Sequence, residues 1–225
     1  MTRHLTPGEP LVLASDNPGK INAVSRLTAG VVDKVLGLRK LRLTQADETG
    51  TTFEENATIK ALAAAKASGR PALADDSGLE VAALDNQPGV YMADWTYDGK
   101  GGRDEALGNA KILDALEKKG ATDPAQRKAT MVTVLALAWP DGDVRMVRGE
   151  VTGTIAELPR GANGFGFDPI FQPDGADKTF GEMNDDEKRG YSARTRAFEQ
   201  FVANHLPPTG PAPVREQEPR RTLAH

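Results

Sequence analysis

The order of apolar and polar positions along the chain predicts alternating strands and helices. Apolar runs at 11–15, "LVLAS", and at 72–81, "ALADDSGLEV", have the length and composition of buried strands. The clearest helix is predicted at 51–69, because this segment is rich in alanine, begins after two threonines able to cap it, and ends at Gly69. A further helix is expected at 21–30, and a second strand with loops at 31–45.

The second half of the chain continues the same alternation. An amphipathic helix is predicted at 102–120, and two long apolar segments, 127–140 and 143–158, meet at an Asp-Gly-Asp turn as a hairpin. Ser192 is expected to cap a last helix at 192–206. In the helix at 102–120 the predicted buried stripe consists of Ala106, Ala110, Leu113 and Leu116.

This order of elements predicts the α/β class, with a mixed sheet in one domain over residues 1–206. Residues 207–225 contain proline and charge with almost nothing to bury. They are therefore predicted to be a disordered tail.

Composition excludes several classes of function. The net charge of −4 lacks the basic excess of a duplex-binding protein, so no duplex nucleic acid is expected as a partner. The absence of cysteine excludes disulfides, thiolate metal sites and a cysteine nucleophile, and the three histidines form no zinc-ligand pair. The longest apolar run, at 131–139, is too short to cross a membrane, and no signal peptide is predicted. We therefore expect a cytoplasmic protein without a membrane partner.

The segment "SDNPGK" at 15–20 joins a predicted strand to a predicted helix. Backbone N–H groups at a helix N-terminus, together with Lys20, can hold phosphate oxygens. The segment is not a Walker A loop, and an ordinary turn with an exposed lysine explains it equally well.

Asp75 and Asp76 interrupt an apolar strand, where burial of a charge is costly. In a continuous strand the two side chains point to opposite faces, so only one is expected to face a given site. Mg²⁺ needs only one or two protein carboxylates when phosphate oxygens and water complete its shell. Glu48, which precedes the helix at 51–69, can serve as a second metal ligand or lie in solvent.

The segment "GFGFDP" at 164–169 places two phenylalanines and one acid on a loop rich in glycine. A ring on such a loop can stack on a nucleobase, although phenylalanines more often pack in a core. Lys188 and Arg194 flank the start of the last helix and can equally be ordinary surface charges. Taken together, the phosphate loop, the carboxylates, the cations and the stacking loop describe a site for a nucleoside triphosphate with Mg²⁺.

Five motifs in register over residues 11–205 resemble those of the inosine triphosphate pyrophosphatase family, which acts on non-standard purine nucleotides. They are "SDNPGK", "ETGTTFEENATIKA", "ADDSGLEV", "GFGFDPIF" and "EKRGYSAR". The resemblance implies an elongated domain with a long mixed sheet, a central cleft and a homodimeric assembly. It also implies Mg²⁺-dependent hydrolysis of ITP, dITP and XTP to the monophosphate and pyrophosphate.

The resemblance further implies a role for individual residues. Asp76 would accept the proton of the attacking water, and Glu48 and Asp76 would hold Mg²⁺. The residues expected to contact substrate are Ser15, Asn17, Lys20, Lys60, Ser77, Phe165, Gly166, Phe167, Asp168, Lys188, Ala193 and Arg194. On this basis Asp75 is expected to act as a brace.

Two positions depart from the family pattern. Ala193 stands where the family has a base-contacting histidine, and Asp94 stands where it frequently has an arginine. Ala193 keeps open the alternative of a nucleotide-binding regulatory module with little turnover. A pyrophosphatase that acts on other modified nucleotides is the second alternative.

Overall fold

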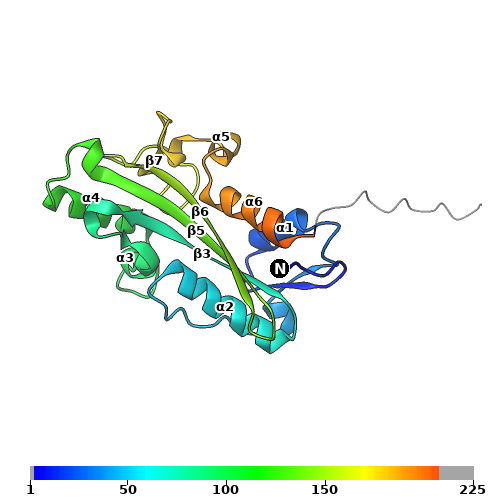
Figure 1. The fold of residues 1–225 in the computed structure, drawn as a ribbon. Helices are drawn as coiled ribbons and strands as arrows, with labels where there is room; N and C mark the ends of the chain where they lie inside the picture. Colours follow the sequence, from blue (N-terminus) through cyan, green and yellow to red (C-terminus); the bar gives the residue numbers. More distant parts are fainter. Residues whose placement is uncertain (1–2, 208–225) are drawn as a thin grey trace, which may run out of the picture.

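The computed structural model describes residues 3–207, and within them the chain forms one open, mixed sheet of seven strands (Figure 1). The strands are β1 (Leu11–Leu13), β2 (Val35–Gly37), β3 (Ala72–Val81), β4 (Gln87–Pro88), β5 (Lys128–Ala138), β6 (Val144–Ile155) and β7 (Phe171–Pro173). Their order is β2-β1-β3-β5-β6-β7, with β4 paired to the far end of β3. The predicted α/β class with a mixed sheet is confirmed.

The α-helices are α1 (Pro18–Leu27), α2 (Phe53–Ser68), α3 (Met92–Thr96), α4 (Glu105–Lys118), α5 (Asp185–Arg189) and α6 (Ala193–His205). Short 3₁₀ helices lie at η1 (Arg39–Leu41), η2 (Ala82–Leu84), η3 (Gly89–Tyr91), η4 (Pro124–Arg127) and η5 (Phe180–Glu182). No helix within residues 3–207 combines the length and the apolar character needed to span a membrane.

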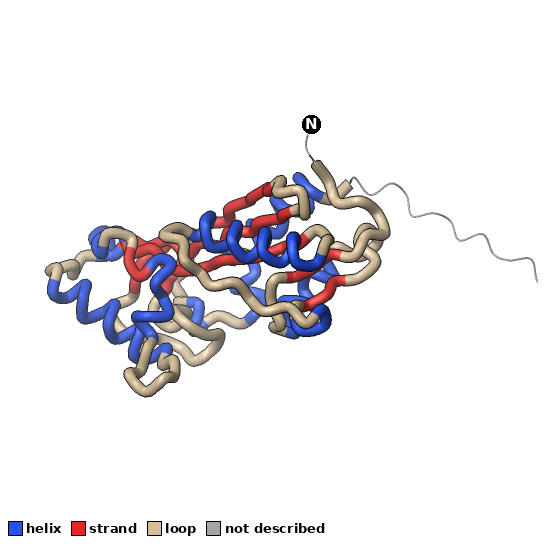
Figure 2. Tube along the Cα trace, turned by 90° about the horizontal axis from the view of Figure 1, so that it is seen from below, coloured by secondary structure: helices blue, strands red, loops and turns tan. Residues whose placement is uncertain are grey.

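Three long antiparallel strands, β3, β5 and β6, run along the length of the elongated molecule (Figure 2). The short strands β1 and β2 add to one end of β3 in parallel. The two ends of the described chain meet at this end of the molecule, where the Leu5 N–H donates to the His205 carbonyl oxygen at 3.0 Å.

Alternate residues of the strands pack against different helices. On one face of β3, Ala72 and Ala74 pack with the alanines of α2. On the other face, Leu73 packs with Val24 of α1 and Phe201 of α6. The helices α2 and α6 accordingly cover opposite faces of the sheet (Figure 1). Because side chains alternate along a strand, the same alternation decides toward which helices the later side chains of β3 point.

The predicted ends of α2 and α6 are confirmed. The hydroxyl of Thr52 accepts from the Glu55 N–H, and Gly69 closes α2 in the left-handed conformation at φ 65°. Ser192 caps α6 by accepting from the Thr195 N–H. Helix α1 begins three residues earlier than predicted, at Pro18, whose fixed φ suits the first helical position.

The predicted stripe of α4 is confirmed at Leu116, which is buried, and at Leu113, which packs against the core, but it is wrong for the two alanines. Ala106 and Ala110 are exposed, whereas Gly108 and Asn109 are buried together with Ile112 and Leu116. The cause is close packing against α3, since a Cβ at Gly108 would lie 2.8 Å from the Thr96 methyl. A glycine and a buried amide therefore form the inward face, which an apolar pattern does not predict. The predicted tail lies beyond the described residues except for Pro207.

Candidate active site

A cleft of about 740 Å³ lies beside the middle of β3. The parallel strand β1 pairs with β3 only as far as Leu73, and β4 pairs with it only from Glu80 onward. Between these points no strand of the described chain covers this edge of β3. Side chains from both faces of β3 therefore reach one cleft around the free edge.

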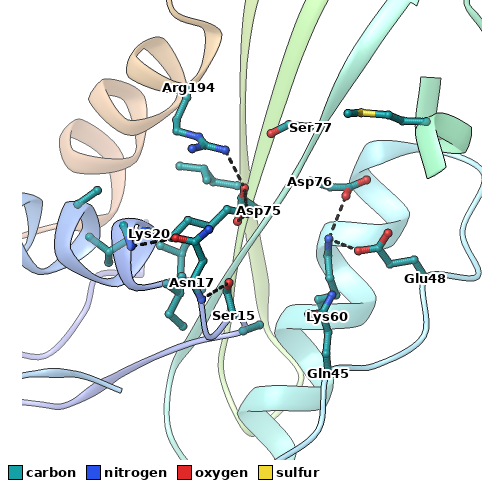
Figure 3. Close-up of a pocket in the computed structure, with 18 of the residues that line it drawn as sticks. Ser15, Asn17, Lys20, Gln45, Glu48, Lys60, Asp75, Asp76, Ser77 and Arg194 are labelled. Atoms are coloured by element: carbon teal, nitrogen blue, oxygen red, sulfur yellow. Dashed lines mark hydrogen bonds and ion pairs between the residues drawn. The ribbon is translucent and has the colours of Figure 1, made fainter. Parts of the chain in front are cut away.

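This geometry corrects the prediction that only one of the two aspartates faces the site. Asp76 points toward α2 and Asp75 points toward α1 and α6, and both line the cleft (Figure 3). The glycine that follows them is structural, because a Cβ at Gly78 would lie 2.7 Å from the Gly89 carbonyl oxygen.

Asp76 belongs to a partly buried ionic group with Lys60, which is buried, and Glu48, whose side chain is 39% exposed. The ammonium of Lys60 donates to Glu48 Oε1 at 2.7 Å and to Asp76 Oδ1 at 2.9 Å. Burial raises the pKa of Asp76, and the nearby charge of Lys60 only partly opposes this. Burial alone would lower the pKa of Lys60, but its bonds to the two carboxylates outweigh burial and raise this pKa. The two carboxylates thus converge on one cation.

Asp75 joins the two walls on the other face of β3. Lys20 donates to both Asp75 oxygens at 2.8 Å, and Arg194 lies 3.5 Å from Asp75 Oδ2 (Figure 3). The side chain of Asp75 is only 11% exposed. Asp75 therefore holds one cation from α1 and one from α6 beside the cleft, which gives the predicted brace specific partners.

The N-terminus of α1 is capped from within. Asn17 Oδ1 accepts from the N–H groups of Gly19 and Lys20, at 2.9 and 3.2 Å, and Pro18 has no N–H. Ser15 Oγ accepts from the Asn17 N–H at 3.2 Å. Asn17 thus occupies the N–H groups of Gly19 and Lys20, two of the backbone donors predicted to cradle phosphate.

A second, mainly apolar cavity of about 240 Å³ shares Ser77, Met92, Phe165 and Arg194 with the cleft. The two phenylalanines of the loop separate here. Phe167 is 3% exposed and packs in the core, whereas Phe165 is 66% exposed at the mouth of both spaces. Phe167 therefore takes the core-packing alternative, whereas Phe165 stays a candidate for stacking on a base.

Asp168 and Lys188 brace the loop from beneath. Asp168 is 3% exposed, accepts from the Phe165 N–H at 2.9 Å and forms an ion pair with Lys188. The Lys188 ammonium lies 5.4 Å from the centroid of the Phe165 ring and 5.1 Å from that of Phe180. Lys188 is thus held between the loop and the cavity rather than being a free surface charge.

All fourteen residues predicted for the site line one of the two spaces. Those on the cleft are Ser15, Asn17, Lys20, Glu48, Lys60, Asp76, Ser77, Phe165 and Arg194. Those on the apolar cavity are Ser77, Phe165, Gly166, Phe167, Asp168, Lys188, Ala193 and Arg194. Ala193 is buried and borders the cavity, and this is the position at which the family pattern has histidine.

Sequence reasoning missed several lining residues. Gln45, Met92 and Arg103 border the cleft, yet none lies in a motif that carries its own chemical signal. Arg103 forms no ion pair with any acid between residues 3 and 207, unlike Lys20, Lys60 and Arg194. An unpaired arginine in a loop has no recognisable pattern, because its position depends on how α3 and α4 pack.

The donor set suits a divalent cation shared with a substrate. Residues 3–207 contain no group of three or more carboxylate or histidine side chains arranged for a metal ion. Glu48 and Asp76 do converge on a single cationic group, the Lys60 ammonium. Two carboxylates with phosphate oxygens and water make a typical Mg²⁺ environment, so the residues present fit the predicted ion.

Comparison with known proteins matches the Ham1 family model to residues 11–204. A dITP/XTP pyrophosphatase of Agrobacterium fabrum is 52% identical over 204 residues, and the match covers 87% of this chain and 95% of the relative. A dITP/XTP pyrophosphatase of Rhizobium meliloti has the same identity and the same coverage.

Solved structures agree with these relatives. A HAM1 protein from Coxiella burnetii superposes with a TM-score of 0.80 at 38% identity, covering 87% of this chain and 97% of that one. A dITP/XTP pyrophosphatase from Mycobacterium abscessus superposes with a TM-score of 0.73 at 38% identity, covering 85% and 98%. The resemblance inferred from the five motifs is confirmed, and the chain belongs to the Ham1 family.

Proposed function

We propose that the protein hydrolyses non-standard purine nucleoside triphosphates, namely ITP, dITP and XTP, to the monophosphate and pyrophosphate. The observation that carries this proposal is the two-part site. A charged cleft, lined by four cations and three carboxylates, opens beside an apolar cavity with an exposed aromatic ring at the shared mouth. The first part suits a triphosphate and the second a base. The relatives named dITP/XTP pyrophosphatase support the same activity.

The reaction breaks the anhydride bond between the α- and β-phosphates. Water attacks the α-phosphorus, Asp76 accepts its proton, and pyrophosphate leaves. In the metal-free chain, burial raises the pKa of Asp76. A carboxylate with a raised pKa is a stronger base, which suits a proton acceptor. Lys20 and Lys60 offset the negative charge that develops on the phosphate oxygens, and Ser15, Asn17 and Ser77 supply neutral polar contacts.

We propose Mg²⁺ as the metal, held by Glu48 and Asp76. When bound, the ion supplies positive charge to the phosphate oxygens of the substrate. Lys60 holds both carboxylates in place within 3 Å of its ammonium. Removal of the metal by EDTA should abolish turnover, and Mg²⁺ should restore it.

Base selection is assigned to Arg194, Lys188 and the loop at 164–169. A 6-keto purine presents an acceptor at position 6, whereas adenine presents a donor there. Arginine and lysine only donate hydrogen bonds, so an amino group leaves their donors without partners. The site should therefore prefer ITP and XTP to ATP.

The test is pyrophosphate release with Mg²⁺ across ITP, dITP, XTP, ATP, GTP, a pyrimidine nucleoside triphosphate and a methylated one. Release from the first three at rates at least tenfold above ATP would support the proposal. Binding without release would favour the regulatory alternative, and a preference for pyrimidine or methylated nucleotides would favour the other one. We also propose a homodimer, which light scattering coupled to gel filtration would test.

A further inference from the structure

Helix α4 contributes no lining residue to the cleft or the cavity. Two of its side chains, however, bind the loop at 164–169, which borders both spaces. Gly166 N–H donates to Glu105 Oε2 at 2.6 Å, and Asn109 Nδ2 donates to the Gly166 carbonyl oxygen at 3.1 Å. Glu105 and Asn109 are four residues apart and so lie on one helix face. Together they hold the peptide groups on both sides of one α-carbon.

Gly166 is the residue at which the loop reverses between its two rings. Its φ is +62°, a conformation that favours glycine. Phe165 on one side is 66% exposed, whereas Phe167 on the other is 3% exposed. The backbone angles of Gly166 therefore decide that the Phe165 ring, rather than the Phe167 ring, is exposed at the shared mouth.

The buried amide of Asn109 makes one hydrogen bond within residues 3–207, the one to the Gly166 carbonyl oxygen. Asn109 is 4% exposed, and within residues 3–207 its Oδ1 has no hydrogen-bond partner. Burying a polar atom without a partner costs free energy, which the bond to Gly166 only partly offsets. An apolar side chain would pack there at lower cost, so the residue type suits the loop rather than the core.

Helix α4 also fixes the opposite wall. Gly108 lies against Thr96 of α3, the helix that begins with Met92, and Met92 lines both the cleft and the cavity. The terminal methyl of Met92 would lie 3.7 Å from a Cβ at Gly166. One helix thus sets both the ring and the methionine that flank the shared mouth.

We propose that Glu105 and Asn109 are positioning residues for base recognition, which they control by fixing the Gly166 peptides and hence the Phe165 ring. This inference rests on the proposed function. If correct, loss of either bond weakens base binding while the phosphate and water groups stay in place.

The test uses Glu105→Ala, Glu105→Gln, Asn109→Asp and the matched control Glu117→Ala, an exposed acid on the same helix. Glu105→Ala loses the acceptor and should raise KM for ITP about tenfold, the scale of one hydrogen bond, with kcat within about twofold. Glu105→Gln keeps an acceptor oxygen and should restore KM, and Glu117→Ala should match the parent. Asn109→Asp removes the donor and should raise KM at least as much.

A parent-like KM and a parent-like ITP to ATP preference in Glu105→Ala would overturn the proposal, as would a fall in kcat at unchanged KM. Equal damage from Glu105→Gln and Glu105→Ala would also overturn it, because it would indicate charge rather than a hydrogen bond. If Asn109→Asp does not fold, the exposed Glu105 pair decides alone.

Amide hydrogen exchange at Gly166 gives a readout independent of turnover. Exchange of the Gly166 amide proton should be faster in Glu105→Ala and stay slow in Glu105→Gln. Unchanged protection in both variants would contradict the proposal that Glu105 fixes the Gly166 peptide. A parent that releases no pyrophosphate would refute the proposed function, while this exchange comparison would still test the contact.

Discussion

Asp76→Asn separates the chemical role of this carboxylate from its structural one. The substitution keeps the shape of the side chain and removes its charge and its basicity. A positioned general base typically contributes about 10²- to 10⁴-fold to a rate. Because Asp76 is also a proposed metal ligand, we expect kcat to fall by about 10³-fold or more, equivalent to about 4 kcal/mol of transition-state stabilisation.

The structure indicates a much smaller effect on folding. Removing one partner of a fully buried ion pair costs about 3–5 kcal/mol. Here Lys60 keeps its bond to Glu48 at 2.7 Å, and the amide oxygen at position 76 can still accept from Lys60. The burial that raises the pKa of Asp76 also makes its charged form costly in the folded state. We therefore expect a loss of stability of only about 1–2 kcal/mol.

The assay is steady-state pyrophosphate release from ITP with Mg²⁺, alongside thermal unfolding of the same preparations. Asp75→Asn serves as the matched variant, since it sits next along β3 and contacts Lys20 and Arg194 instead. It should mainly raise KM. The assignment of roles would be refuted by an Asp76→Asn enzyme that turns over within tenfold of the parent while folded Asp75→Asn loses turnover.

Three further predictions concern other residues. Arg194→Ala should reduce the preference for ITP over ATP by about tenfold or more, a larger change than that caused by Ala193→His. If steady-state kinetics on both nucleotides show an unchanged preference in Arg194→Ala, Arg194 has no role in base recognition. Arg103→Gln should raise KM for ITP about tenfold at nearly constant kcat, whereas Lys100→Gln on the same loop should leave KM unchanged. Equal KM values in the two variants would show that Arg103 does not contact substrate. Burial lowers the pKa of His205, so below about pH 6.5 the imidazole binds a proton more readily in the unfolded chain than in the folded one. The parent should therefore lose stability as the pH falls, and Tm should fall less between about pH 7 and pH 5 in His205→Leu. Equal falls in Tm would contradict this.

Local signals in the sequence determined most of the elements and pointed to the residues that line the cleft and the cavity. The caps at Thr52 and Ser192 and the stop at Gly69 act within one turn of their own helices, so neighbouring residues suffice to predict them. The alternation of β3 is likewise local, and it correctly predicted that Asp75 and Asp76 point to opposite faces. The fourteen predicted site residues were found through motifs, each a short run of sequence.

Only the tertiary structure decided which parts of the chain come into contact with those elements and side chains. Both aspartates share one cleft because β1 ends at Leu13, opposite Leu73, and leaves the following edge of β3 free. No property of residues 72–81 specifies the length of a partner strand. Asn17 occupies two of the backbone donors of α1 that the sequence assigned to phosphate. The inward face of α4 follows from the approach of Thr96 to Gly108 and from the loop at Gly166, which lies 57 residues from Asn109 along the chain. Such contacts depend on how elements distant in sequence pack, and hydrophobic periodicity within one element does not encode them.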